Sequence, residues 1–247
     1  ETVNNLAMWD GGTWSAVGNG VHGEVETLAF DSTGNLYVGG SFSMAGGLVP
    51  VSSLAMWDGS TWSAIGDGVY GDVNTLAFDS TGNLYVGGGF GMVSGVPANN
   101  IAMWDGSVWS GLGGGLDGYV SHVIFDSIGN LYVGGSFGMA DGMPVNSIAM
   151  WDGSVWSGLG GGLSGEASVL AFDATGNLYV GGNFGMAGGM PANSIAMWDG
   201  SVWNDMGGGV LNGHVSDFDF DTSGNLFVGG VFDTAGNVSV EIISFFD

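Results

Sequence analysis

Lysine and arginine are absent from this chain of 247 residues, which carries 24 acidic residues and a formal net charge of −24. Average composition would supply about 30 basic residues in a chain of this length. Without these cations the chain cannot form a Lys or Arg salt bridge or clamp a phosphate group. Nucleic acid binding depends on such contacts, and an anionic membrane surface repels a chain of the same sign. We therefore expect neither nucleic acid nor an anionic membrane among the partners.

Cysteine is also absent, so the chain has no disulfide and no thiol nucleophile. The three histidines, His22, His122 and His214, stand at unrelated places and give no metal-ligand spacing. No acid–base constellation is present. No apolar run approaches the ~20 residues of a membrane-spanning helix. We expect no enzyme activity, no cofactor and no metal site.

What the chain does contain is one stretch in five copies, seen most clearly as IAMWDGSVWSGLG from Ile148. The other copies begin at Leu6, Leu54, Ile101 and Ile195, so that successive copies start 48, 47, 47 and 47 residues apart. All ten tryptophans lie in these copies, two in each. A period of this length indicates a repeat architecture, in which each unit stacks on its neighbours because it cannot bury a core alone.

Each repeat predicts four short antiparallel strands, as the first repeat shows. Residues 6–9 and 13–17 flank Asp10-Gly11, a strong hairpin signal. A Gly-rich loop over 18–23 leads to strands at 25–30 and 36–42, joined by a tight turn. The Gly39-Gly40 pair inside the last strand indicates a close approach of backbone. A longer loop over 43–53 precedes the next copy.

This pattern predicts an all-β fold: a single five-bladed β-propeller domain over residues 1–247, with four antiparallel strands in each ~47-residue blade. A β-solenoid is the alternative, but its coils are shorter and lack two hairpin turns per repeat. We expect the ring to close by joining the N- and C-terminal strands. Residues 241–247 (EIISFFD) align with the IAMWD strand as a sixth, partial copy, so that this end either competes at closure or belongs to a longer array.

The order of a strand with LYVGG, a strand ending in Trp-Asp and a strand opening with Trp resembles kelch-type propeller repeats. It is still more similar to the GGSF…NSIAMWDGSVW repeats of bacterial extracellular propellers, over residues 5–247. Those repeats often carry Lys where Met8 or Met56 stands here. The resemblance implies an extracellular or cell-surface location. Five repeats of this length also resemble tachylectin, a sugar-binding propeller, in architecture alone, and a shared fold does not establish a shared function.

Two repeated aspartates are candidate ligands, but turn formation explains both better. The first precedes glycine in the WDG hairpin, and the second opens the DSTGN turn; Asp and Gly or Asn favour such turns. Asp217, Asp219 and Asp221 alternate in a way that resembles a calcium site, yet they lack the spacing of an EF-hand loop. The tryptophans are either sugar-stacking platforms or core packing between blades, and we favour the core.

Strand parity places both tight turns at one end of each blade and the longer loops at the other. Loops on a rigid scaffold often carry binding sites. Methionines there would form an adaptable apolar ring suited to protein contact, unless they fold down over neighbouring blades. The candidate ligand-binding residues on these loops are Tyr70, Met92, Asn99, Asp117, Tyr119, Met139, Asp141, Asn146, Met186 and Asn193.

We therefore expect a non-catalytic extracellular module that binds protein surfaces and self-associates through its methionine loops or a terminal strand. The alternative is a lectin-like module that binds neutral glycans at repeated sites and gains avidity from repetition. The long loops have few polar side chains, which favours the first interpretation.

Overall fold

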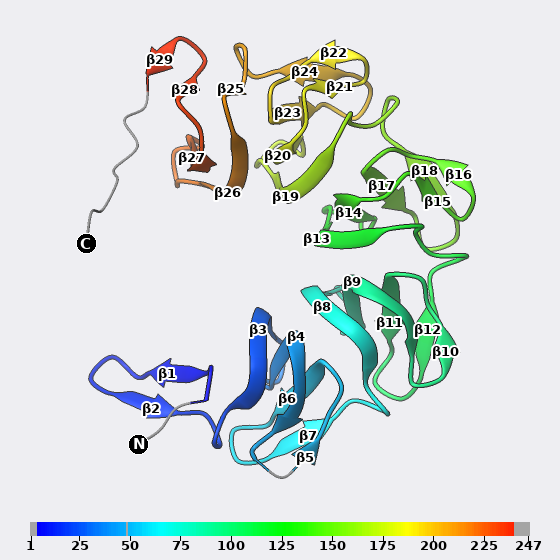
Figure 1. Ribbon diagram of the computed structural model, residues 1–247, viewed down its shortest axis with the longest axis vertical. Helices are drawn as coiled ribbons and strands as arrows, with labels where there is room; N and C mark the ends of the chain where they lie inside the picture. Colours follow the sequence, from blue (N-terminus) through cyan, green and yellow to red (C-terminus); the bar gives the residue numbers. More distant parts are fainter. Residues whose placement is uncertain (1–3, 48, 240–247) are drawn as a thin grey trace. The chain divides into compact units, whose positions relative to one another are not determined.

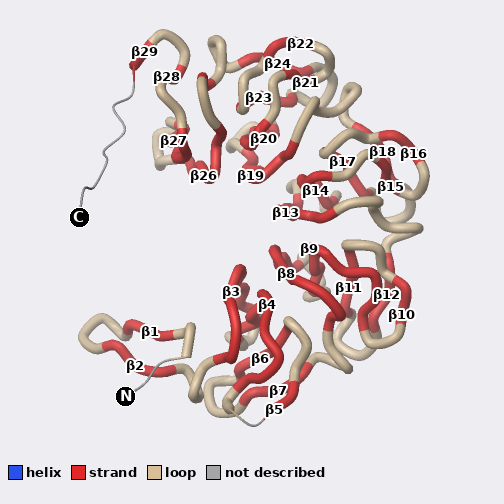
Figure 2. The backbone as a smooth tube through the Cα atoms, viewed as in Figure 1, coloured by secondary structure: helices blue, strands red, loops and turns tan. Residues whose placement is uncertain are grey.

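A computed structural model describes residues 4–47 and 49–239 of the chain, and these residues form antiparallel β-sheets without a helix (Figures 1 and 2). The all-β prediction is confirmed. With no helix among them, the described residues include none that could cross a membrane as a helix. The predicted sixth strand copy at 241–247 lies outside the described residues. The chain divides into two compact units, Glu1–Val120 and Ser121–Asp247.

The first unit holds two four-stranded sheets, with strand orders β3-β4-β6-β7 and β8-β9-β11-β12. Short strands β5 and β10 extend them, and β1 pairs with β2 alone. The strands are β1 Ala7–Trp9, β2 Trp14–Ala16, β3 Val21–Phe30, β4 Leu36–Ala45, β5 Val49–Pro50, β6 Leu54–Trp57, β7 Trp62–Ala64, β8 Val69–Phe78, β9 Leu84–Val93, β10 Val96–Pro97, β11 Ile101–Trp104 and β12 Trp109–Gly111.

The remaining sheets have orders β13-β14-β17-β18 and β19-β20-β23-β24, followed by the pair β26-β27. Smaller pieces are the pairs β15-β16 and β21-β22 and the group β25-β28-β29. The strands are β13 Tyr119–Phe125, β14 Leu131–Ser136, β15 Met139–Ala140, β16 Met143–Pro144, β17 Ile148–Trp151, β18 Trp156–Gly158, β19 Glu166–Phe172, β20 Leu178–Asn183, β21 Met186–Ala187, β22 Met190–Pro191, β23 Ile195–Trp198, β24 Trp203–Asp205, β25 Val210–Leu211, β26 His214–Phe220, β27 Leu226–Val231, β28 Thr234–Ala235 and β29 Val238–Ser239.

Each four-stranded sheet takes its first two strands from one repeat and its last two from the next WDG copy. In the second sheet Leu84 lies opposite Trp104 and Tyr85 opposite Met103, and the corresponding register recurs in the other sheets. Each sheet is therefore a meander of four consecutive strands, with β1-β2 and β26-β27 each forming two strands of the same pattern.

The diglycine in the second strand is required by packing, as the sequence predicts. A Cβ on Gly40 would lie 2.1 Å from the backbone oxygen of Glu24 in the paired strand. A Cβ on Gly39 would lie 2.4 Å from Val73 in the neighbouring sheet. Both distances are shorter than any real carbon contact, so larger residues here would push the strands and the sheets apart.

Neighbouring sheets within each unit pack through a recurring pair of aromatic rings. Tyr37 of β4 meets Phe78 of β8 edge to face, with ring centroids 5.1 Å apart. In the second unit Tyr132 meets Phe172 and Tyr179 meets Phe220 in the same way, at 5.1 and 5.0 Å. Such pairs contribute about 0.5–1.5 kcal/mol beyond the area that they bury.

Two predicted loops turn out to contain strands. The Gly-rich loop at 18–23 ends early, because β3 already begins at Val21 and follows β4 as far as Ala45. The longer loops fold back as small hairpins, such as β15-β16 with Met139 opposite Pro144. The sequence did not indicate these strands, because each is only two residues long and is flanked by turn residues.

Candidate binding surfaces

The WDG hairpins hold their aspartates within the turn. Asp58 Oδ1 accepts hydrogen bonds from the backbone N–H groups of Thr61 at 2.7 Å and Ser60 at 2.8 Å. These bonds, with others from both hydroxyls, hold the pKa of Asp58 well below its usual value. In the same turn of another copy, the backbone N–H of Val202 and the Ser201 side chain lower the pKa of Asp199 to about 2. These carboxylates have a structural role, as the turn interpretation predicts.

The second tight turn is organised in the same manner. Asp31 Oδ1 accepts from the backbone N–H groups of Thr33 and Asn35, both at 2.9 Å, and Oδ2 accepts from the Asn35 amide at 2.8 Å. Slight burial raises the pKa of Asp31, but these hydrogen bonds outweigh it and the pKa is lowered. Among the residues that the structure describes, no three His, Asp or Glu side chains cluster as metal ligands.

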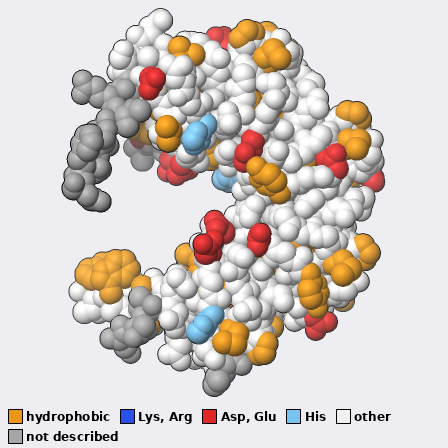
Figure 3. All heavy atoms as spheres, viewed as in Figure 1, with side chains coloured by type: hydrophobic (Ala, Val, Ile, Leu, Met, Phe, Trp, Pro, Cys, Tyr) orange, Lys and Arg blue, Asp and Glu red, His pale blue; other side chains and the backbone are white. Residues whose placement is uncertain are grey.

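The tryptophans mostly form core. The second Trp of four copies is buried, and the indole N–H groups of Trp62, Trp109 and Trp203 each donate to a backbone oxygen of the preceding repeat. Trp62 Nε1 donates to the backbone oxygen of Gly18 at 2.9 Å, and Trp203 Nε1 to that of Leu159 at 2.9 Å. The exceptions are Trp9 and Trp14 on the β1-β2 pair, which are 50% and 70% exposed. In Figure 3 hydrophobic side chains gather over this hairpin.

Methionine hairpins occupy the other end of each sheet, opposite the tight turns. The exposed methionines there are Met92 (46%), Met139 (43%), Met143 (39%), Met186 (47%) and Met190 (46%). These side chains are therefore accessible at the surface, although more than half of each is covered. Tyr70, also exposed, lies opposite Met92 across β8 and β9.

Three predicted site residues form a structural bridge that the sequence did not reveal. The side-chain amides of Asn99, Asn146 and Asn193 each donate to a backbone oxygen fifteen residues later, at 2.8–3.0 Å. The bridge fastens the segment before a WDG hairpin to the Gly-rich loop that follows the same hairpin. These amides are therefore engaged within the fold, and a part for them in ligand binding stays a prediction.

The other candidates are distributed along the same end. Asp141 sits at the tip of the β15-β16 hairpin with a left-handed φ of 47°. Asp117 is exposed in the loop before β13, and Tyr119 is exposed at the start of that strand. The structure therefore exposes Asp117, Tyr119 and Asp141, and it pairs Tyr70 with Met92.

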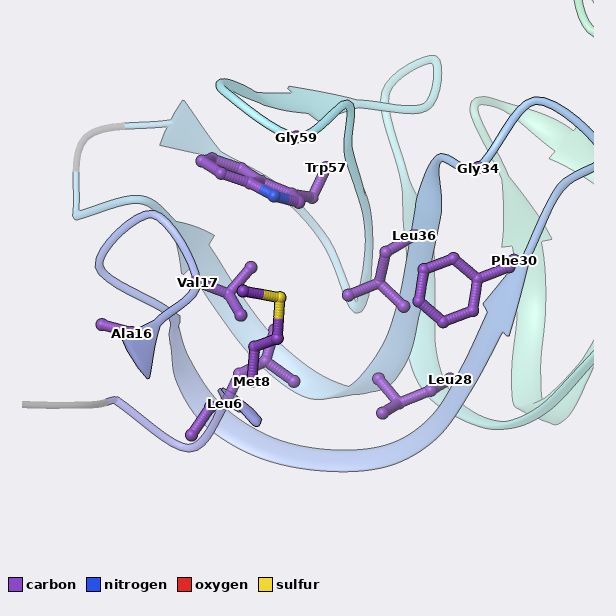
Figure 4. A pocket seen from close by; sticks show the side chains of 11 residues that line it. Leu6, Met8, Ala16, Val17, Leu28, Phe30, Gly34, Leu36, Trp57 and Gly59 are labelled. Atoms are coloured by element: carbon purple, nitrogen blue, oxygen red, sulfur yellow. The ribbon is translucent and has the colours of Figure 1, made fainter. Parts of the chain in front are cut away.

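An apolar cleft of about 510 Å³ opens beside the first sheet, and sequence reasoning did not predict it. Leu28 and Phe30 of β3 form one side, and Met8 and Val17 of the β1-β2 region form the other (Figure 4). Phe30 is 66% exposed, although its equivalents Phe78, Phe172 and Phe220 each pack on a tyrosine of the preceding sheet.

The three histidines and the alternating aspartates of β26 form no recognisable catalytic or metal-binding arrangement among the described residues. His22 and His214 are exposed on strands. Burial lowers the pKa of His122, and Asp217 opposes this only in part. Asp217 and Asp219 accept hydrogen bonds from the backbone N–H groups that follow them, at 2.9 and 2.8 Å.

Three solved structures with similar folds are distant in sequence. The extracellular domain of a putative hybrid two-component system from B. thetaiotaomicron aligns with a TM-score of 0.56 at 12% identity, over 84% of this chain and 26% of that one. PorZ, a surface component of the type-IX secretion system of Porphyromonas gingivalis, gives 0.52 at 15%, over 91% and 35%. A gluconolactonase from Xanthomonas campestris gives 0.52 at 17%, over 88% and 78%. At these identities the likeness concerns the fold alone.

The chain spans only about a quarter of the first of these solved chains and about a third of PorZ. No curated protein sequence matches it significantly. The model of the Rax2 C-terminal beta propeller domain matches residues 14–107 and 167–246, more than two thirds of the chain. With its meandering four-stranded sheets, the chain belongs to this family and is a β-propeller module.

Proposed function

We propose that this chain is a non-catalytic extracellular propeller module that binds protein surfaces, a second copy of itself included. The observation that carries the proposal is the set of methionine hairpins at one end of the sheets. Met139 with Met143 and Met186 with Met190 project from β15-β16 and β21-β22 as exposed pairs, each beside a proline. Methionine adapts to irregular apolar surfaces, and grouped exposed apolar side chains mark interaction sites.

The charge of the chain is consistent with this choice of partner. Its formal net charge of −24 disfavours anionic polymers, whereas apolar or basic protein surfaces remain compatible. The extracellular location is supported by the similarity to an extracellular bacterial domain and by PorZ, a surface component.

Sedimentation velocity across a range of concentrations tests this function. We expect the wild type to self-associate, and the variant Met139→Gln/Met143→Gln/Met186→Gln/Met190→Gln to stay monomeric. Val108→Gln/Val155→Gln/Val202→Gln is the matched control, because these valines at the tight-turn end are even more exposed than the methionines. A wild type that stays monomeric at every concentration, or equal association of all three proteins, would overturn the proposal.

We further propose that the module is a five-bladed ring of kelch-like repeats. The pairs β26-β27 and β1-β2 would together form the fifth blade, with β27 beside β1 in the register of the other sheets. In that register Phe227 lies opposite Met8, as Tyr85 lies opposite Met103. The uncovered Phe30 and the 65% exposed Phe227 support this closure, because they occupy the two halves of the aromatic pair that joins other sheets.

The second candidate function is the binding of neutral carbohydrate. Repeated equivalent sites are disfavoured by the Asn bridges, which engage the best polar groups of the loops. One repeat lacks this bridge, and its surroundings carry the polar and aromatic groups that a sugar requires.

A further inference from the structure

The Asn bridge is present in four copies of the repeat and missing from one. The Asn4 amide donates to Asn19, and its equivalents at 99, 146 and 193 donate in the same way. In the second copy the equivalent residue is Ser52, and the carbonyl fifteen residues later belongs to Asp67. The backbone here is unchanged, since Val69 N–H donates to the Ser52 oxygen at 2.8 Å, as Leu116 N–H does to Asn99 at 2.9 Å.

The shorter side chain leaves a hollow where the other copies place an amide. This hollow has a volume of about 300 Å³ and is lined by Pro50, Val51, Ser52, Ala64, Gly66, Asp67 and Tyr70. Tyr70 is 54% exposed, and Asp67 is exposed as well. The equivalents of Tyr70 are His22, Asp117, Ser164 and Leu211, so no other copy combines an aromatic ring with this gap.

Hydrogen bonds hold the backbone around the hollow in place. The backbone N–H of Asp67 donates to the Ser94 hydroxyl at 2.8 Å, and Ser94 N–H donates to the Gly68 oxygen at 3.0 Å. Tyr70 stands on β8, paired with Met92. Asp67 and Gly66 also line a second hollow of about 390 Å³, together with Trp104 and Val108. Asp67 therefore borders both hollows.

We infer that this hollow is a single binding site for a neutral sugar residue. The inference rests on the second proposed function, carbohydrate binding, and restricts it to one repeat. The Tyr70 ring would stack on the apolar face of the sugar, while the Asp67 carboxylate and Ser52 hydroxyl would bind its hydroxyl groups. Acidic sugars are disfavoured, because the site holds a carboxylate and the chain has no Lys or Arg to pair with them. The volume is at the lower limit for small-molecule pockets, which fits one sugar unit.

Saturation-transfer NMR with neutral probes tests the site: the methyl glycosides of glucose, galactose and mannose, and N-acetylglucosamine. We expect at least one probe to bind, and Tyr70→Ala and Asp67→Asn to weaken it at least tenfold. Ser52→Asn should weaken it similarly while restoring the bridge, so its thermal unfolding temperature should not fall. Val202→Ala, which changes an equally exposed side chain outside the hollow, is the matched control and should bind as the wild type does.

The two ways of failing are distinguishable. If the wild type binds none of these probes, both carbohydrate binding and the site are overturned. If the wild type binds but Tyr70→Ala, Asp67→Asn and Ser52→Asn bind equally well, the site is overturned and carbohydrate binding belongs elsewhere on the chain.

Discussion

Phe30 and Phe78 occupy the same position in two successive sheets, yet their surroundings differ. Phe78 packs edge to face on Tyr37 of the sheet before it, whereas Phe30 is 66% exposed beside an apolar cleft. Two residues earlier, Leu76 is buried and Leu28 is half exposed. The residue types are identical, so the difference comes from the neighbouring sheet. Burial on these faces is decided between repeats rather than within one.

The largest effect on stability is expected at the buried tryptophans, which contact the preceding repeat. We expect Trp203→Ala to lower the free energy of unfolding by about 3–5 kcal/mol, because it leaves a cavity and removes the bond to Leu159. The exposed neighbour Val202→Ala should change it by less than about 0.5 kcal/mol. Urea unfolding followed by tryptophan fluorescence measures both, and similar values would contradict the packing described.

The matched pair Phe78→Ala and Phe30→Ala tests whether the first sheet stays uncovered in solution. If the fifth blade closes on it, both substitutions should cost about 2–3 kcal/mol, somewhat less than for a fully buried Phe. If the face is open, Phe30→Ala should cost less than about 0.5 kcal/mol while Phe78→Ala keeps its effect. Thermal and urea unfolding of the two variants would decide between these outcomes.

The Asn bridge can be removed from one copy and introduced into another, and we expect smaller, opposite changes in stability. Asn99→Ser should destabilise by about 1 kcal/mol, the net value of one hydrogen bond, and Ser52→Asn should stabilise by a similar amount. Calorimetric unfolding temperatures measure both. Equal and opposite shifts support the bridge, whereas a loss of stability in Ser52→Asn would show that the Ser52 hollow cannot accept an amide.

The smallest effect is expected from acid. Hydrogen bonds lower the pKa of Asp199 to about 2 from its ordinary value of 3.8, so its ionised form favours the folded state. That stability is present above about pH 4 and is lost as the pH falls toward 2. The difference in unfolding temperature between wild type and Asp199→Asn should therefore shrink over this window. A difference that stays constant with pH would contradict the turn interpretation.

The regular parts of the fold follow from short-range chemistry and were predictable. Asp-Gly turns, alternating apolar strands and the diglycine pair each act over a few residues, as Asp58 and Gly40 show. The Asn99 bridge was not predictable, because its acceptor is a backbone oxygen fifteen residues away. The cleft at Phe30 was not predictable either, because the sequence of its strand resembles that of the equivalent strands, whose side chains are covered. The sequence allowed the candidate site residues on the loops to be named. It did not show that the Asn side-chain amides among them are bonded to backbone oxygens.

The proposed closure of the ring, in which β27 pairs with β1, can be tested directly by an introduced disulfide. The chain has no cysteine, so Met8→Cys with Phe227→Cys introduces the only two thiols. Residues directly opposite on paired antiparallel strands lie within disulfide range. We predict rapid oxidation to an intramolecular disulfide, seen as a faster monomer on a non-reducing gel, with Met8→Cys/Val231→Cys as the out-of-register control. Free thiols after oxidation, or only intermolecular products, would contradict the claim.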